Sequence, residues 1–196
     1  MKRILVGLSI VAAAAALAAV FAGRSPGSRG LDRLSNAGTP VADVSPAGRR
    51  ALRLLDATNL RLLGQVGRRQ FFRLHARGSA CFATGDVDAG APAPSDVYCP
   101  HGAFPTAGLP VYDDPSVEIA KGEPGVAHLL ALDGLAADGV ERVELARNGQ
   151  VLAASPVTDN VFSLSVAGVA IGGTRLVARD GDGNVVFSRL YSSPPS

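Results

Sequence analysis

The hydrophobic residues of this chain recur at every second position over most of its length after residue 60. A period of two is typical of β-strands with one buried face. The alternation is clearest in Phe162-Ser163-Leu164-Ser165-Val166. Gly, Asn and Asp interrupt the pattern at short intervals, and Asn148-Gly149 is the strongest hairpin signal in the chain. The pattern predicts a mainly β protein.

Four short apolar runs predict a small antiparallel sheet in the first half of the chain. The expected strands are residues 60–66, 70–76, 80–84 and 97–99. Turn-like residues, such as Arg77-Gly78-Ser79, separate them. Because side chains alternate along a strand, residues 72 and 74 should share one face, and residues 71, 73 and 75 the other.

A short helix is expected before this sheet. Ser45 can cap a helix and Pro46 suits its first position, so the sequence predicts a short helix that continues through residues 47–55, weakened by Gly48. Residues 45–110 would form a small α+β module held together by its sheet, its helix and a disulfide. The segment 100–115 contains four prolines and predicts an ordered connector without strand structure.

The second half of the chain predicts seven strands. They are expected at residues 116–120, 126–132, 140–147, 150–154, 160–166, 174–179 and 184–190. Short strands with a turn every 8–12 residues favour a β-sandwich, here residues 111–191.

The positions of turn and core residues in this half resemble a known family. They are Gly134-Leu135-Ala136-Ala137-Asp138-Gly139-Val140, Val143, Asn148-Gly149, Phe162, Leu176, Ala178, Asp180 and Gly183-Asn184. Their spacing over residues 115–190 resembles that of bacterial immunoglobulin-like domains, which occur in exported and cell-surface proteins. The resemblance implies a seven-stranded immunoglobulin-like sandwich and an extracytoplasmic setting. It implies no catalytic residue, because such domains typically act as spacers or binding modules.

The N-terminus has the pattern of an export leader. Met1-Lys2-Arg3 is followed by an uncharged stretch, residues 4–23, with small residues at its end. Cleavage after Ala22 would release a secreted protein, whereas retention would leave residues 4–23 as a membrane anchor. The intact mass of the protein in membrane and soluble fractions distinguishes the two outcomes. Residues 24–44 predict a flexible tether, and residues 192–196 a disordered tail.

The chain contains two cysteines, Cys81 and Cys99. In an exported protein a single pair is most simply a disulfide, and the spacing is far from that of a C-x-x-C redox or metal motif. The bond would close a loop that includes a floppy stretch rich in Pro, Gly and Ala, residues 86–94. The chain-entropy estimate for such a cross-link is a stabilisation of about 3 kcal/mol.

Charge divides the chain into a basic and an acidic part. Residues 24–77 contain 11 Arg against 3 Asp, a balance of +8, and residues 78–196 contain 6 Lys or Arg against 14 Asp or Glu, a balance of −8. The two parts could lie against each other with their charges solvated. Alternatively, the basic part could contact an anionic membrane or wall polymer. The candidate contacts are Arg61, Arg68, Arg69, Arg73 and Arg77.

Other candidate chemistry is sparse. Asp180-Gly181-Asp182-Gly183-Asn184 begins like a calcium loop, but its sixth position is Val185, so an ordinary hairpin loop is favoured. The three histidines, residues 75, 101 and 128, are isolated in sequence, which argues against a zinc site. Asp113 and Asp114 are adjacent in an extended segment, so their side chains should point apart. We expect no catalytic residue, no metal site and no cofactor.

These observations favour an exported, non-catalytic interaction or structural protein. The alternative is an extracytoplasmic ligand-binding or sensing module with a pocket between the two modules, lined by Phe104, Tyr112 and the connector around them. Nucleic acid is not expected as a partner, because the protein is expected to be exported and hardly any aromatic residues are interleaved with the basic residues near Arg68-Arg69. The identity of a ligand or protein partner does not follow from the sequence.

Overall fold

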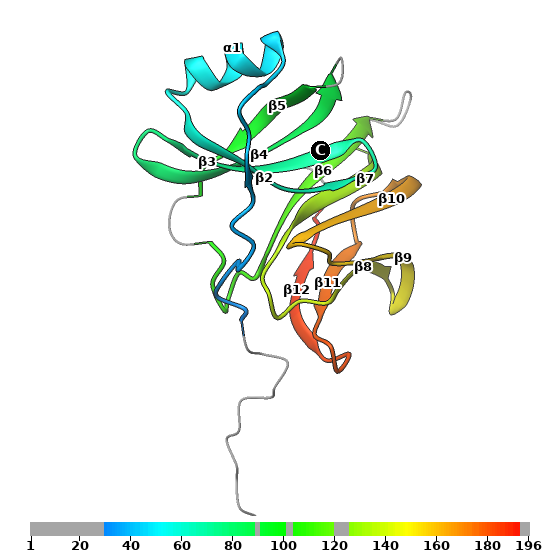
Figure 1. Cartoon of the computed structure of the whole chain (residues 1–196). Coiled ribbons are helices and arrows are strands. Elements are labelled where there is room, and N and C mark those ends of the chain that lie inside the picture. The colour runs from blue at the N-terminus through cyan, green and yellow to red at the C-terminus, as the bar shows by residue number, and fades with distance from the viewer. Residues whose placement is uncertain (1–29, 89–90, 101–103, 120–125, 193–196) are drawn as a thin grey trace, which may run out of the picture.

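The computed structural model describes residues 30–88, 91–100, 104–119 and 126–192. It confirms a mainly β protein with antiparallel sheets and one short helix (Figure 1). The proposed leader, His101 and residues 193–196 lie outside the described residues.

The N-terminal module is a five-stranded antiparallel sheet in the order β1-β2-β3-β4-β5. Its strands are β1 (Thr39–Pro40), β2 (Thr58–Val66), β3 (Arg69–Ala76), β4 (Ser79–Asp88) and β5 (Ala91–Tyr98). Strands that follow one another in sequence are neighbours in space, as expected for short turns between apolar runs. The predicted faces of β3 are confirmed: Phe72 and Leu74 pack in one hydrophobic cluster and Phe71 in another.

The helix α1 (Pro46–Leu54) begins at the predicted cap and covers one face of this sheet (Figure 1). The Ser45 Oγ atom accepts a hydrogen bond from the Gly48 amide at 3.1 Å. Gly48 is buried against β5, where an added Cβ would lie 2.9 Å from Pro94 Cδ. This glycine was predicted to weaken the helix. In the fold its small size lets the helix pack closely on the sheet.

Within the segment predicted to be floppy, residues 86–88 and 91–94 are instead paired strand residues of β4 and β5. Asp86 pairs with Ala93, and Val87 pairs with Pro92. The prediction was wrong because prolines usually exclude a strand. However, β5 lies at the edge of its sheet, where a strand needs backbone donors on one side only.

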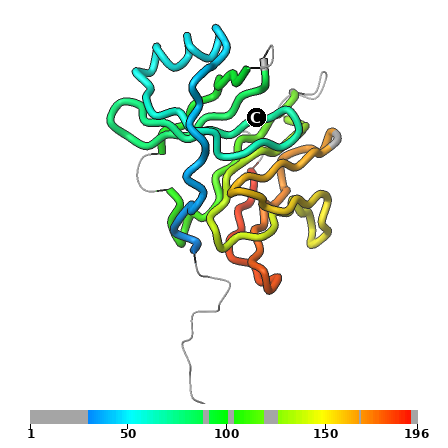
Figure 2. Tube along the Cα trace, viewed as in Figure 1, coloured from blue at the N-terminus to red at the C-terminus, as the bar shows by residue number. Residues whose placement is uncertain are grey.

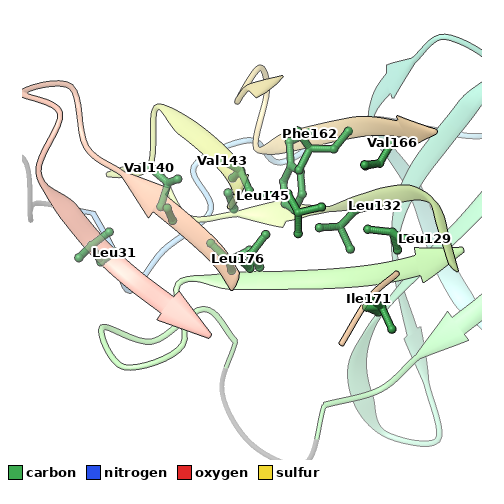
Figure 3. Close-up of a cluster of buried hydrophobic side chains, with 14 residues drawn as sticks. Leu31, Leu129, Leu132, Val140, Val143, Leu145, Phe162, Val166, Ile171 and Leu176 are labelled. Carbon is green, nitrogen blue, oxygen red and sulfur yellow. The ribbon is translucent and has the colours of Figure 1, made fainter. Parts of the chain in front are cut away.

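The C-terminal module consists of two antiparallel sheets, ordered β10-β7-β6 and β12-β11-β8-β9. The strands are β6 (Val111–Ile119), β7 (Ala127–Ala136), β8 (Arg142–Arg147), β9 (Gln150–Pro156), β10 (Val161–Ala170), β11 (Arg175–Arg179) and β12 (Val185–Leu190). Buried residues from both sheets form one hydrophobic cluster, in which Leu132 and Phe162 meet Leu145 and Leu176 (Figure 3). All seven predicted strands are confirmed, with boundaries shifted by a few residues.

The largest of these shifts concerns β6. Residues 111–115 were predicted to belong to a connector, but they pair with β7 from Val111 onward. Pro115 is tolerated because β6 is an edge strand. Asp113 and Asp114 are therefore strand residues rather than connector residues, and this places their side chains on opposite faces.

A flexible tether was expected over residues 24–44, but the described part, residues 30–44, is packed against the rest of the protein. Leu31 is buried in the core of the C-terminal module, and β1 pairs with β2 of the N-terminal sheet. Figure 2 shows this blue segment running alongside both modules before it reaches α1. The polar composition of this segment did not predict these contacts, because they are made largely by backbone amides and by Asn36. The Asn36 side chain donates hydrogen bonds to the backbone carbonyls of Leu63 and Asp159.

Asp138 holds the start of this segment. Its carboxylate accepts hydrogen bonds from the Ser35 amide at 2.8 Å and from Arg33 Nε at 3.0 Å. Desolvation acts to raise the pKa of Asp138, but the hydrogen bonds from Ser35 and Asn160 and the charge of Arg33 outweigh it and lower the pKa. The charged carboxylate is therefore the form that the folded protein favours.

We expect this attachment to weaken in acid. A lowered pKa in the folded state stabilises the protein above the ordinary Asp value near 4, and the contribution is lost as the pH falls through the lowered value. Hydrogen exchange over residues 30–36, corrected for intrinsic rates, should therefore rise below pH ~4 in the native protein. Asp138→Asn should raise it already at neutral pH. Asp32→Asn, which changes an exposed carboxylate in the same segment, should not.

Candidate functional site

A pocket of about 240 Å³ lies between the two modules. Strands β3, β4 and β5 of the N-terminal sheet form one side, and β6 and β7 of the C-terminal module form the other. The lining residues are Phe71, Phe82, Ala83, Thr84, Asp96, Val97, Tyr98, Tyr112, Asp114, Gly134 and Leu135. The site therefore exists only when both modules are in place.

The floor of the pocket belongs to a hydrophobic cluster that joins the modules. Phe71 and Phe82 from the N-terminal sheet pack with Leu135 and Val161 from the C-terminal module, and all four are buried. Phe71 reaches this cluster because it lies on the face of β3 opposite to Phe72. The N-terminal sheet is thus apolar on both faces, one covered by α1 and the other by the second module.

Aromatic rings form a continuous wall above this floor. Tyr98 of β5 stacks on Tyr112 of β6, with ring centroids 4.3 Å apart and planes inclined by 11°. Phe104 meets Tyr112 edge-on at 6.2 Å and Phe82 edge-on at 5.4 Å. Tyr98 remains 36% exposed, so the wall is accessible from solvent.

Arg69 is surrounded by carboxylates at the polar side of the pocket. Its Nη2 atom donates to Thr84 Oγ1 at 2.8 Å and lies 3.4 Å from both Asp96 and Asp114. Its Nε atom lies 3.6 Å from Asp133 without making a hydrogen bond. One guanidinium thus faces three carboxylates, and the cluster carries a net negative charge.

The ionisation of Tyr112 and Asp133 reflects burial first and the neighbouring carboxylates second. Desolvation, followed by the charge of Asp114, raises the pKa of Tyr112 to about 12, so its hydroxyl is neutral at physiological pH. Desolvation is also the main cause that raises the pKa of Asp133, with Asp114 and Asp86 adding to it and Ser163 and Arg69 opposing it. Both shifts favour the neutral, protonated forms of these two side chains.

Asp113 takes no part in this pocket, because its side chain points away from that of Asp114, as predicted. Its buried carboxylate pairs with Arg189 and accepts a hydrogen bond from Tyr191. Desolvation raises the pKa of Asp113, although Tyr191 and Arg189 act to lower it. These contacts join β6 to β12 and thus connect the two sheets of the C-terminal module.

The five arginines predicted to contact an anionic surface are not gathered on one patch. Arg69 belongs to the acidic cluster between the modules, which leaves it no role on a free surface. Arg68 and Arg77 are exposed at turns on opposite ends of β3. Arg61 and Arg73 lie together on β2 and β3. Anionic contact by the four arginines other than Arg69 stays a prediction.

The disulfide between Cys81 and Cys99 is confirmed. It joins the beginning of β4 to the residue that follows β5, and so closes the base of the hairpin that forms one wall of the pocket. Structural disulfides are typical of proteins in oxidising, extracytoplasmic compartments.

The remaining candidates have structural roles or lie apart. The Asp180 carboxylate accepts hydrogen bonds from the amides of Asp182 at 3.0 Å and Asn184 at 2.8 Å, an arrangement that fits a hairpin loop. His75 lies on β3 and His128 on β7. Over the described ranges, no group of His, Cys, Asp and Glu has the arrangement of a metal site. No helix in the same ranges is long and apolar enough to cross a membrane.

Sequence reasoning named Tyr112 and Phe104 for such a pocket. Tyr112 lines it, whereas Phe104 packs against Phe82 and Tyr112 without lining it, and Tyr98 and the carboxylates were missed. Both wall strands carry a Tyr and an Asp two positions apart, Asp96 with Tyr98 and Tyr112 with Asp114. This repeated spacing was the available signal, and it has meaning only once residues 111–115 are known to form a strand. No family model matches the chain, and no match was found among curated proteins or solved structures.

Proposed function

We propose that this protein is an exported, non-catalytic binding protein whose pocket between the modules holds a small cationic ligand with an apolar body. The observation that carries the proposal is the Tyr98–Tyr112 stack beside the carboxylates of Asp96 and Asp114. Aromatic faces and carboxylates both attract ammonium groups, and the apolar floor suits a hydrocarbon body.

One feature supports binding rather than catalysis. The polar groups at the pocket are already paired with one another, since Thr84 donates to Asp114 at 3.2 Å and accepts from Arg69. Their hydrogen-bonding capacity is largely used in fixing the two modules together. A purely structural role is the second candidate, favoured by the extensive cluster that joins the modules.

The strand order of the C-terminal module supports an immunoglobulin-like identity for residues 111–191. Strands β6, β7 and β10 correspond in order to A, B and E of that fold, and β8, β9, β11 and β12 to C, C′, F and G. Such domains typically serve adhesion or recognition. The disulfide supports export of the protein, and the leader pattern of residues 1–23 supports either secretion or anchoring.

Titration with benzyltrimethylammonium, followed by tyrosine fluorescence and calorimetry, tests the proposed pocket. We expect saturable binding that Tyr112→Ala and Asp114→Asn each weaken about tenfold, the equivalent of one cation–π or charge contact. Tyr112→Phe keeps the ring and should retain binding. Asp182→Asn, which removes an exposed carboxylate far from the pocket, is the matched charge control. Absence of saturable binding, or equal binding by Tyr112→Ala, would favour the structural role.

A further inference from the structure

We propose that a second pocket, formed by Arg61, Arg73 and His75 beside residues 37–40, binds a phosphate-type oxyanion. This pocket of about 380 Å³ lies on the N-terminal sheet and shares no lining residue with the pocket between the modules. The inference is therefore independent of the proposed cationic ligand.

The register of β2 and β3 brings the positive charges together. Arg61 and Arg73 are directly opposite each other in the antiparallel pair. His75 follows Arg73 by two residues and so lies on the same face of β3. Like charges directly opposite each other on neighbouring strands destabilise a sheet. A bound anion between them would remove this repulsion.

The structure holds one of these arginines in a fixed position. Arg61 donates from Nε to the Ala37 carbonyl at 2.5 Å and from Nη2 to the Gly38 carbonyl at 2.6 Å. Both carbonyls belong to the segment that leads into β1. These contacts orient the guanidinium but leave its charge uncompensated, because a carbonyl carries no negative charge. Its remaining N–H groups are available to a ligand.

The contrast with Arg69 shows what the pocket lacks. Arg69 lies on the same face of β3 and is paired with three carboxylates. Within the described residues, neither Arg61 nor Arg73 makes an ion pair, and no Asp or Glu lines their pocket. The same strand therefore carries one neutralised arginine and one that is not.

The donors present suit a phosphate group. Arginine offers a planar fork that matches phosphate oxygens, and Asn59 and His75 add further hydrogen-bond donors at the rim. The phosphate could be free or carried by a lipid headgroup. The proposal narrows the anionic contact predicted from the sequence to Arg61 and Arg73 and excludes Arg68 and Arg77 from the site.

Titration of the native, disulfide-bonded protein with inorganic phosphate at constant ionic strength tests the site. The ring protons of His75 should shift saturably in NMR spectra, and phosphate should raise the melting temperature. Arg73→Gln should weaken binding about tenfold, as expected for the loss of one charge-assisted contact. Arg77→Gln removes the same charge from an exposed turn and should bind like the native protein.

Equal weakening by Arg73→Gln and Arg77→Gln would overturn the proposal, because it would indicate diffuse attraction without a site. Absence of a saturable shift would overturn it as well. Vesicles containing phosphatidylglycerol distinguish the source: tighter binding to them than to inorganic phosphate, lost in Arg73→Gln, indicates a headgroup, and equal affinity indicates free phosphate. Tyr112→Ala should bind phosphate normally, so the proposal for one pocket can be rejected without rejecting the proposal for the other.

Discussion

Alanine at position 134 should lower the free energy of unfolding by about 3 kcal/mol, the upper part of the usual range for overpacking. Gly134 lies in β7, the central strand of its sheet, between β6 and β10. A Cβ at this position would overlap the Tyr112 carbonyl oxygen and the ring of Phe162, which is fully buried in the core (Figure 3). Neither a backbone carbonyl between paired strands nor a buried ring can move away at low cost.

Urea unfolding followed by circular dichroism measures this loss. Gly108→Ala is the matched control, because Gly108 is exposed and an added Cβ there would meet no atom within 4 Å. That variant should unfold with a midpoint close to that of the native protein. A native-like midpoint for Gly134→Ala would show that β6 and β7 adjust far more easily than their packing indicates.

Loss of the Cys81–Cys99 bond should also lower the free energy of unfolding by about 3 kcal/mol, according to the chain-entropy estimate for a loop of this size. The closed loop includes most of β4 and β5 and therefore the residues from Phe82 to Tyr98 that form one wall of the pocket. We further expect faster hydrogen exchange in this hairpin after reduction, because its base is no longer cross-linked.

Two forms of the protein distinguish the stability contributed by the cross-link from that contributed by the packing of the sulfur atoms. Reduction of the native protein keeps both side chains, whereas the double variant Cys81→Ala, Cys99→Ala removes Sγ atoms from a site where Cys81 is fully buried. The reduced protein should show the loss due to the cross-link alone, and the double variant a somewhat greater one. Unchanged stability after reduction would mean that sheet packing alone fixes the β4–β5 hairpin.

Local chemistry determined much of this fold. Alternation in residues 162–166 predicted a strand, Asn148-Gly149 predicted the hairpin between β8 and β9, and Ser45 predicted the start of α1. The cysteine pair predicted the disulfide once export was inferred. These features were readable because each depends on residues that are neighbours in sequence or on a pairing that has a single solution.

The site, in contrast, was decided by contacts between distant residues. Arg69 was one candidate contact for an anionic surface, but in the fold it meets Asp96 and Asp114, which lie 27 and 45 residues further along the chain. The stack of Tyr98 on Tyr112 likewise depends on how two modules pack together.

The same reason explains the predictions of structure that failed. Proline-containing segments became strands because they lie at sheet edges, and a polar N-terminal segment became ordered because Leu31 fills a core built from other residues. The three-dimensional arrangement of the whole chain decides which strands lie at an edge and which charges find a partner. Local propensity and alternation specified the strands, but only long-range packing placed the charges and aromatic rings of the two pockets.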